Sequence, residues 1–488
     1  MTKTQEAFAV GAADGELVLQ LGSMGNRHGL ITGATGTGKT VSLQVLAEAY
    51  SRQGVPVFAA DIKGDLSGIN APGKPHKKID ERLGKIPLPE YNQRGFPTLF
   101  WDVFGKKGHP IRATTSDIGP LLLSSLLELN DTQTGVLYAA FALADDEGLL
   151  LLDLKDLRAL LSHMGENAKA LRLQYGNISS ASIAAIQRRL LVLEEQGGEA
   201  FLGEPAVALD DLMRRDDDGR GVISILDATR LTQQSPRVYA TFLLWLLSEV
   251  YETLPEVGDP TWPTFVMFFD EAHLLFKRAP EPLLDKIEQV ARLIRSKGVG
   301  IYFISQSPLD LPDNVLGQMG LKVQHALRAY TPKDRRTIRA VADSFRTNPD
   351  IDTAAVLTEL GTGEALVSAL DRKGAPLPVQ RTLIRPPESR IGPLKVAERK
   401  AALQDSLVAG VYDKAVDRDS AYELLRARAE QAAESAAAKL AAKKTKKKSS
   451  RSSSRQTPGE AMLKSTLRSM GTSLGRALIR GLLGSFRR

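Results

Sequence analysis

The sequence predicts an α/β fold in which a largely parallel sheet is covered by helices, with a mostly helical insert and a basic C-terminal tail. Short, nearly continuous apolar segments alternate with amphipathic segments, which is typical of parallel strands buried under helices on both faces. A glycine-rich loop joins one predicted strand to one predicted helix. Between residues 119 and 215, Leu and Ala recur at helical spacing without such strands, which predicts the insert.

The predicted core elements lie on both sides of this insert. Residues 1–118 form the first part of the core, with strands at 28–32, 55–61 and 98–104, a helix at 41–50, and an irregular Gly- and Pro-rich excursion at 68–95. Residues 216–390 form the second part, with strands at 221–227, 264–270, 299–305, 321–326, 363–370 and 377–384, and helices at 238–254, 283–297 and 332–344. We expect the strands of both parts to join one sheet.

The C-terminal region differs from the core in composition. Residues 391–442 predict a helical extension, because Ala, Glu, Lys and Arg dominate from 412 onward. Residues 443–488 begin with a Lys- and Ser-rich linker, 443–457, which is expected to be disordered. Over 461–486, Leu and Met then recur every three or four residues between Lys and Arg. This basic amphipathic tail is compatible with packing on another subunit, with nucleic-acid phosphates or with an anionic membrane surface.

Residues 33–40 match the phosphate-binding loop G-x-x-x-x-G-K-[ST] in full. Backbone N–H groups of such a loop bind phosphate oxygens, and its glycines permit the backbone angles that this requires. Lys39 is predicted to reach the β- and γ-phosphates, and the Thr40 hydroxyl is predicted to bind Mg²⁺. The predicted nucleotide contacts are Gly33, Ala34, Thr35, Gly36, Thr37, Gly38, Lys39, Thr40 and Val41.

The strand predicted at 264–270 ends in two acids, Asp270 and Glu271. In P-loop nucleotide hydrolases an aspartate of this kind holds Mg²⁺ together with the loop hydroxyl, so we assign that role to Asp270. Glu271 is then predicted to accept a proton from the attacking water. The alternative is that both acids only cap the helix that follows.

Two further groups are expected at the site. Gln306 follows the strand at 299–305 and is predicted to lie beside the Asp270 strand, facing the γ-phosphate as a sensor of hydrolysis. Phosphoryl transfer also requires a cation on the developing charge, often an Arg from a neighbouring subunit. The candidates are Arg328, Arg335, Arg336 and Arg295, although most surface Arg side chains are only solvated or paired.

Composition and charge exclude several classes of protein. The chain has no Cys, which excludes disulfides and thiolate chemistry and favours a reducing, cytoplasmic location. It also has neither a signal-peptide pattern nor a stretch of 18 apolar residues. Of its 64 Lys and Arg, 14 lie between Lys439 and Arg488 beside one acid, so residues 1–438 carry 50 basic and 56 acidic residues. The basic charge therefore belongs to the tail, and a uniformly basic DNA-binding surface is not predicted.

Five segments resemble, in order and strand context, the HerA–FtsK superfamily of P-loop NTPases. They are HGLITGATGTGKT, VFAADIKGD, FVMFFDEAH, RSKGVGIYFISQSP and QHALRAYTPKDRR. The resemblance covers about residues 20–385 and is strongest to the HerA-like branch, among its short bacterial YjgR-type members. Proteins of this superfamily are ring-forming, ATP-driven DNA translocases.

The resemblance implies a RecA-like (additional-strand) core and Mg²⁺-dependent ATP hydrolysis that drives a DNA translocase or helicase. It implies ATP contacts in the phosphate loop, Mg²⁺ at Asp270, catalysis at Glu271 and sensing at Gln306. It also implies an arginine finger in trans from the region of Arg328 to Arg336, with Arg295 as the alternative. The family assembles as hexameric rings that hold ATP at subunit interfaces and pass DNA through the pore.

Two departures from the family leave a rival function open. About 32 residues precede the phosphate loop here, so the N-terminal barrel through which HerA docks a nuclease is not expected, and a nuclease partner is doubtful. The acidic body gives no independent support for DNA binding, although the Lys106–Lys107 pair and the 73–85 segment are candidate pore contacts. The rival is an ATP-dependent regulatory or scaffold protein that acts on a protein or membrane partner rather than on DNA.

Overall fold

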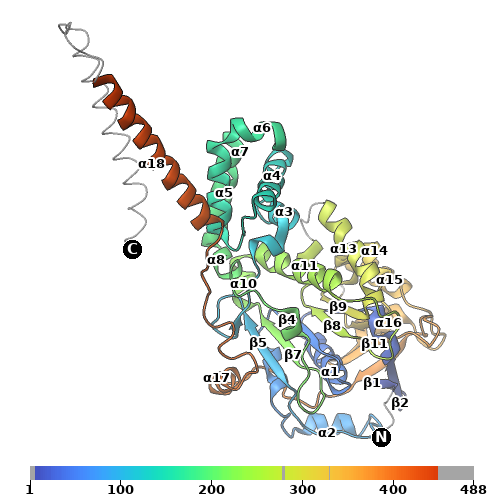
Figure 1. Cartoon of the computed structure of the whole chain (residues 1–488). Helices are drawn as coiled ribbons and strands as arrows, with labels where there is room; N and C mark the ends of the chain where they lie inside the picture. Colours follow the sequence, from blue (N-terminus) through green and yellow to red (C-terminus); the bar gives the residue numbers. More distant parts are fainter. Residues whose placement is uncertain (1–5, 277–280, 329, 449–488) are drawn as a thin grey trace. The chain divides into compact units, whose positions relative to one another are not determined.

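The structure, a computed structural model, describes residues 6–276, 281–328 and 330–448. Twelve strands among these residues form one sheet (Figure 1). In sheet order they are β2 (Glu16–Leu21), β1 (Ala7–Ala13), β12 (Gln380–Ile384), β11 (Glu364–Ser368), β10 (Leu321–His325), β3 (Gly29–Thr32), β9 (Val299–Ser305), β8 (Phe265–Phe269), β4 (Val57–Asp61), β7 (Ile223–Asp227), β5 (Thr98–Asp102) and β6 (His109–Pro110).

In this order, the strands from β10 to β6 are parallel to one another. Strand β11 pairs with β10 in antiparallel orientation, and β12, β1 and β2 follow it in further antiparallel pairs. All strands of the two predicted core parts belong to this sheet, so the predicted α/β fold with a large parallel sheet is confirmed. In a parallel sheet the carboxyl ends of the strands meet at one edge, which we call the carboxyl edge. The opposite edge is the amino edge.

The central strands are buried on both faces, as their continuous apolar sequences predict. In β4, Phe58 and Ala60 contact one hydrophobic core, whereas Val57 and Ala59 contact the other. Side chains of β8 divide in the same alternating way, because successive residues of a strand point to opposite faces. Helices must therefore cover both faces of the sheet.

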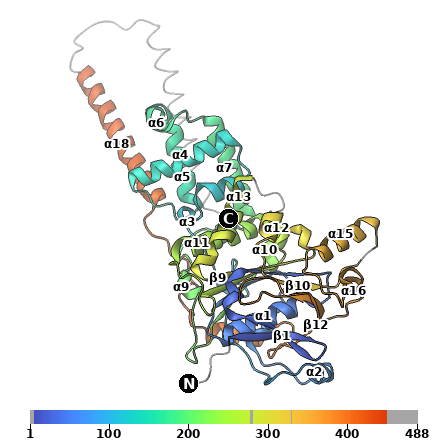
Figure 2. The same cartoon turned by 90° about the vertical axis from the view of Figure 1, so that its right-hand side faces the viewer.

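The insert and several core helices cover the first face. The insert contains α3 (Thr115–Leu126), α4 (Asp131–Glu147), α5 (Leu154–Glu166), α6 (Ala168–Tyr175), α7 (Ser180–Glu195), α8 (Gly198–Phe201) and α9 (Leu209–Leu212). The core helices are α10 (Thr229–Gln234), α11 (Pro236–Thr253), α12 (His273–Phe276), α13 (Glu281–Leu293) and α14 (Asp313–Leu316). In both views α4–α7 form a bundle that extends beyond the sheet (Figures 1 and 2).

Local sequence fixes where the insert helices begin. Thr114, Asn130 and Asp153 precede α3, α4 and α5, and each side chain accepts a hydrogen bond from a backbone N–H of the first helical turn. In return, the side chain of the third helical residue accepts a hydrogen bond from the backbone N–H of this preceding residue. Such reciprocal caps satisfy backbone N–H groups that have no partner within the helix. Gly148 ends α4 in the left-handed conformation, in which glycine is favoured.

The second face carries α1 (Lys39–Arg52), the short 3₁₀ helix η2 (Leu66–Asn70) and α17 (Val396–Gln404), and side chains of β1 and β2 join the same core. The excursion predicted at 68–95 contains α2 (Lys77–Leu83), which buries none of its residues. A third small core joins β11 and the residues just after β10 to α15 (Pro332–Asp343) and α16 (Thr353–Glu359). Further 3₁₀ helices are η1 (Gly22–Arg27), η3 (Ile294–Lys297) and η4 (Pro308–Asp310).

The N-terminal hairpin was missed by the sequence analysis, although a signal for it is present. Asp14 and Gly15 form its turn with φ of 49° and 83°. Asp-Gly between two apolar segments is a strong hairpin signal, because both central residues of a type I′ turn need positive φ. Strand β6 was also missed, since two residues carry no periodic pattern.

The C-terminal expectation was wrong in two places. The extension contains α17 (Val396–Gln404), but its second helix, α18 (Ala421–Lys448), begins later than the composition from 412 onward predicts. Helix α18 also includes 443–448, which we expected to be disordered. Lys is a good helix former, so the run of lysines can continue a helix already begun. Residues 6–425 belong to one compact unit, and α18 enters a second unit at Arg426. The rest of the linker and the amphipathic tail, 461–486, lie outside the described residues.

No helix among the described residues combines the length and the apolar character that crossing a membrane requires.

The stability of the insert should depend on its buried leucines. Leu160 of α5 is fully buried, so Leu160→Ala should reduce the free energy of unfolding by about 2–5 kcal/mol in urea denaturation. Leu173 of α6 is 99% exposed, and Leu173→Ala provides a control that should change it by less than about 0.5 kcal/mol. Equal effects of the two substitutions would contradict the described packing of the insert.

Candidate functional site

The phosphate loop lies at the carboxyl edge, between β3 and α1. Its three glycines have φ of 148°, 79° and 120°, values that side chains disfavour. Lys39 is buried inside the loop, where Nζ donates to Gly33 O (2.6 Å) and Ala34 O (3.1 Å). Burial lowers the pKa of Lys39, and the positive charge of Lys63 lowers it further. The two loop carbonyls thus hold the ammonium group of Lys39 in place.

Residues next to β10 and β11 form hydrogen bonds with this loop. Ala34 N donates to Ala326 O (2.9 Å), just after β10, and Gly363 N, just before β11, donates to Thr37 O (2.9 Å). The buried His325 ring bridges Ser42 Oγ (2.8 Å) and Glu364 O (2.9 Å). Burial lowers the pKa of His325 to about 4, so the ring is neutral at pH 7 and acts as a structural bridge.

Arg82 of α2 supports the same turn from the excursion. Its Nη1 donates to Gly363 O (2.8 Å) and Ile384 O (3.0 Å), and its Nη2 donates to Thr362 O (3.2 Å). These bonds connect the excursion to the turn that bonds to Thr37. The sequence analysis missed this role, because the pattern of residues 68–95 predicts no regular contact.

The strand order brings the predicted acids to the loop. Strand β9 pairs with β3 on one side and β8 on the other, so Asp270 leaves the sheet two strands from the phosphate loop. Asp270 is buried, its Oδ1 accepts from Glu271 N (3.0 Å), and its backbone O accepts from Tyr239 (2.9 Å). Burial raises the pKa of Asp270 to about 6, against the opposing effect of Lys63.

Glu271 has an unusual backbone conformation and a buried carboxylate oxygen that accepts no hydrogen bond from the described residues. Its φ is 48°, in the left-handed region that costs energy for a residue with a Cβ. Ala272 N donates to Ile304 O (2.9 Å) and ties this segment to β9. Oε2 of Glu271 is buried 3.3 Å from His273 Nδ1, yet has no hydrogen bond among the described residues. A water molecule at this oxygen would satisfy it, which suits a general base.

The remaining predicted residues lie at both edges of the sheet. Gln306 is exposed directly after β9, between the loop strand and the Asp270 strand, as expected. Arg328 after β10 and Arg335 and Arg336 on α15 are exposed, with no side-chain ion pair in the described part of the chain. Arg295 instead lies at the amino edge, where it pairs with Asp259 (3.2 Å).

Acids at further strand ends were not singled out by the sequence analysis. Asp61, Asp102 and Asp227 end β4, β5 and β7, next to the Asp270 strand in the sheet. The guanidinium of Arg399 lies 3.2 Å from Asp227 and stacks on Phe100. The signal was present, because each of these predicted strands contains a terminal or near-terminal Asp.

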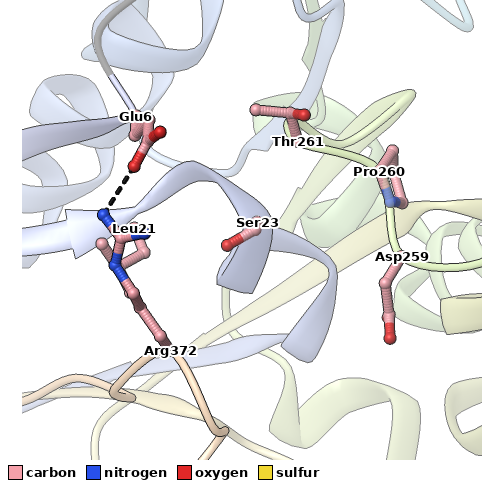
Figure 3. A pocket seen from close by; sticks show the side chains of 7 residues that line it. All are labelled: Glu6, Leu21, Ser23, Asp259, Pro260, Thr261 and Arg372. Carbon is pink, nitrogen blue, oxygen red and sulfur yellow. Dashed lines mark hydrogen bonds and ion pairs between the residues drawn. The ribbon is translucent and has the colours of Figure 1, made fainter.

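A pocket of about 230 Å³ lies elsewhere, at the amino edge (Figure 3). Its two acids are already paired, Glu6 with Arg372 (2.6 Å) and Asp259 with Arg27 (3.3 Å). It holds none of the predicted site residues. The other lining residues are Leu21, Ser23, Pro260 and Thr261.

The residues at the loop suit Mg²⁺. No group of three or more His, Asp and Glu in the described ranges could enclose a metal ion. Mg²⁺ in phosphate-handling enzymes uses one or two protein oxygens together with substrate phosphates and water. The Thr40 hydroxyl and the Asp270 carboxylate supply oxygens of this kind.

The buried charge of Asp270 should cost stability above its pKa. Because the folded pKa is raised from 3.8 to about 6, this group's contribution to stability decreases as pH rises through that interval. Asp270→Asn should therefore raise the free energy of unfolding by up to about 3 kcal/mol at pH 7.5, and by much less at pH 4, while hydrolysis is lost. Denaturant titrations at the two pH values measure this difference.

Asp227 offers a matched control, because it is similarly buried but paired with Arg399. Asp227→Asn should destabilise the protein at pH 7.5. A loss of stability in Asp270→Asn as well would contradict the cost assigned to that charge.

Known proteins are similar to this chain in sequence and in fold. The HerA DNA double-strand break repair helicase of Pyrococcus furiosus is 22% identical over 377 residues, 72% of this chain and 64% of the relative. The protein of the same name from Sulfolobus acidocaldarius is 34% identical over 99 residues, 20% of this chain and 19% of the relative. The chain therefore spans less than two thirds of the length of these relatives.

Among solved structures, the bacterial conjugative coupling protein TrwB, in an unbound form, superposes with a TM-score of 0.51 at 15% identity. The match covers 79% of this chain and 92% of that one, and it supports the P-loop ATPase fold. The model of the family described as "Helicase HerA-like C-terminal" matches residues 7–488, which include the phosphate loop and both strand-end acids. This chain belongs to the HerA-like helicase C-terminal family.

Proposed function

We propose that this protein is an Mg²⁺-dependent ATPase that assembles as a homo-oligomeric ring, hexameric as the family resemblance implies, and drives translocation along DNA. The observation that carries the proposal is the placement of a complete phosphate loop two strands from Asp270 and Glu271 at one edge of the sheet. A loop alone supports nucleotide binding, whereas the second acid supports hydrolysis.

In this proposal the loop backbone binds the β- and γ-phosphates of ATP. The ammonium of Lys39 exchanges its two loop carbonyls for phosphate oxygens, which are stronger acceptors because they are charged. Mg²⁺, held by Thr40 and Asp270, would neutralise charge on the phosphates. Glu271 orients the attacking water and accepts its proton, and Gln306 bonds to the same water or to the γ-phosphate.

The arginine finger is proposed to come from a neighbouring subunit. Arg328 and Arg335 carry exposed guanidinium groups on the segment that follows β10, beside the loop strand. Neither has an ion pair within the described ranges, so each is available to a neighbour. Arg295 is a weaker candidate, because it is paired with Asp259 at the other edge.

DNA as the substrate is supported by the names of the HerA relatives, which are DNA repair helicases. Among the candidate contacts, Lys107 bonds to Thr229 (3.0 Å) and lies 3.5 Å from Asp227, which leaves Lys106 as the more available of the pair. Lysines of the 73–85 segment, such as Lys77 and Lys78, are exposed. The rival remains an ATP-dependent regulatory or scaffold protein with a protein or membrane partner.

Steady-state ATP hydrolysis, measured with and without single- and double-stranded DNA, tests the proposal. We expect several-fold stimulation by DNA and a loss of at least about a hundredfold in Glu271→Gln, because a general base contributes about 10²–10⁴ to the rate. Hydrolysis that requires Glu271 but ignores DNA would favour the rival function. Full hydrolysis in Glu271→Gln would refute the catalytic assignment itself.

A finger in trans predicts complementation between inactive variants. Arg335→Ala and Glu271→Gln should each be nearly inactive, since one lacks the finger and the other the base. Mixed rings contain interfaces in which Glu271 of one subunit meets Arg335 of the next, so mixing should restore a measurable fraction of activity. The same experiment with Arg328→Ala identifies which arginine acts. Arg295→Ala serves as a control, because this variant should hydrolyse ATP without being mixed with another.

Mixtures that stay inactive with both Arg328→Ala and Arg335→Ala would exclude these residues as fingers in trans. A single-subunit species with full turnover, isolated by gel filtration, would exclude the ring requirement.

A further inference from the structure

A lysine without an assigned role lies in the turn that follows β4. Asp61, the last residue of β4, accepts hydrogen bonds from Gly64 N (2.7 Å) and Leu66 N (3.0 Å). Gly64 has φ of 75°, and a Cβ there would lie 3.0 Å from Thr229, so glycine fits this turn. The backbone of Lys63 is therefore held in place, while its side chain remains exposed.

The sheet places this turn beside the two catalytic acids. Ala60 of β4 pairs with Phe269 of β8, so the next residues, Asp61 and Asp270, leave the sheet at equivalent positions. Neighbouring strands lie about 4.8 Å apart. Since β9 and β3 lie on the other side of β8, Lys63 flanks the acids from the side opposite the phosphate loop.

The charge of Lys63 acts on both halves of the site. It opposes the burial that raises the pKa of Asp270, and it adds to the burial that lowers the pKa of Lys39. Two ammonium groups that repel each other across a site are stabilised when an anion with several oxygens lies between them. The end of a triphosphate chain is such an anion.

Two other cations near this turn are engaged with protein groups. Arg399 pairs with Asp227 (3.2 Å), and Lys107 bonds to Thr229 (3.0 Å). Lys63 has no hydrogen bond or ion pair within the described ranges. Its backbone is held in place, and its ammonium group needs no protein contact to be broken before it binds a ligand.

We propose that Lys63 is a second phosphate-binding lysine, which donates in cis to the γ-phosphate of bound ATP and so distinguishes ATP from ADP. The inference rests on the proposed ATPase function. Three observations support the proposal: the turn after β4 is fixed by hydrogen bonds, β4 is the neighbour of β8, and the side chain of Lys63 is exposed. Its flexible chain carries an ammonium group with three donors. The contact is lost when the γ-phosphate leaves, so this turn would respond to hydrolysis within one subunit, independently of an arginine from its neighbour.

Nucleotide affinity, measured by isothermal titration calorimetry, tests this role without turnover. ATP and ADP, each with Mg²⁺, are titrated into the full chain carrying Glu271→Gln, and into the same chain carrying Lys63→Ala as well. A hydrogen bond to a charged group contributes at least about 1.5 kcal/mol, so ATP should bind about tenfold more weakly. ADP affinity should change less than about twofold, and Lys63→Arg should retain most of the ATP affinity.

Lys400→Ala on the same background is the matched control, because this exposed lysine lies on α17 next to Arg399, which reaches the same edge of the sheet. It should leave both affinities unchanged. Equal weakening of ATP and ADP by Lys63→Ala would give Lys63 a structural role and overturn the proposal, as would no change in either. If the parent chain bound neither nucleotide, the proposed function itself would fail, a result distinct from these two.

Discussion

The order β3–β9–β8 at the centre of the sheet is the constraint on which the nucleotide site depends. Parallel strands direct their carboxyl ends to one edge, so the segments after these three strands open on the same side. With β9 between them, the strands that carry the phosphate loop and Asp270 lie about 10 Å apart. Gln306 leaves the sheet in the middle of this gap. The burial of β8 and β9 on both faces fixes the arrangement, because neither strand can shift without exposing apolar side chains.

A frame of hydrogen bonds from distant parts of the chain holds the phosphate loop in its shape. The residues after β10, the turn before β11 and α2 all contribute, through Ala326, Gly363 and Arg82. Such a frame lets backbone N–H groups point at a ligand position before the ligand arrives, which reduces the cost of reorganisation on binding. The excursion that holds α2 is therefore part of the nucleotide site, although its own sequence carries no nucleotide-binding pattern.

Electrostatics gives the carboxyl edge its character. Four aspartates end four neighbouring strands, and burial raises the pKa of both Asp61 and Asp270 to about 6. Buried carboxylates with raised pKa and a strained residue such as Glu271 cost stability, and such costs are concentrated at functional sites. Lys39, Lys63 and Arg399 compensate them in different ways. Arg399 neutralises Asp227 through a direct ion pair, whereas Lys39 is held by carbonyls of the phosphate loop and Lys63 is exposed in the turn after β4.

The sequence by itself determined the α/β class, most strands of the sheet, the helical insert, the phosphate loop and the strand-end acids. These features are local: a glycine-rich turn, a run of apolar residues or a terminal acid is visible in a short window. The β1–β2 hairpin was equally local and was overlooked at Asp14-Gly15. The helical state of 443–448 was misjudged, because charge composition was weighed above helix propensity.

Only the tertiary structure decided which strands are neighbours and which side chains meet across the chain. Arg82 and Gly363 are 281 residues apart, and no periodic pattern links them. Lys63 gains its position from the register of β4 on β8, and Arg295 was separated from the site because it precedes β9 rather than follows it. The physical reason is the same in each case. Strand order and register arise from packing over the whole sheet, so contacts that depend on them are not encoded in any one segment.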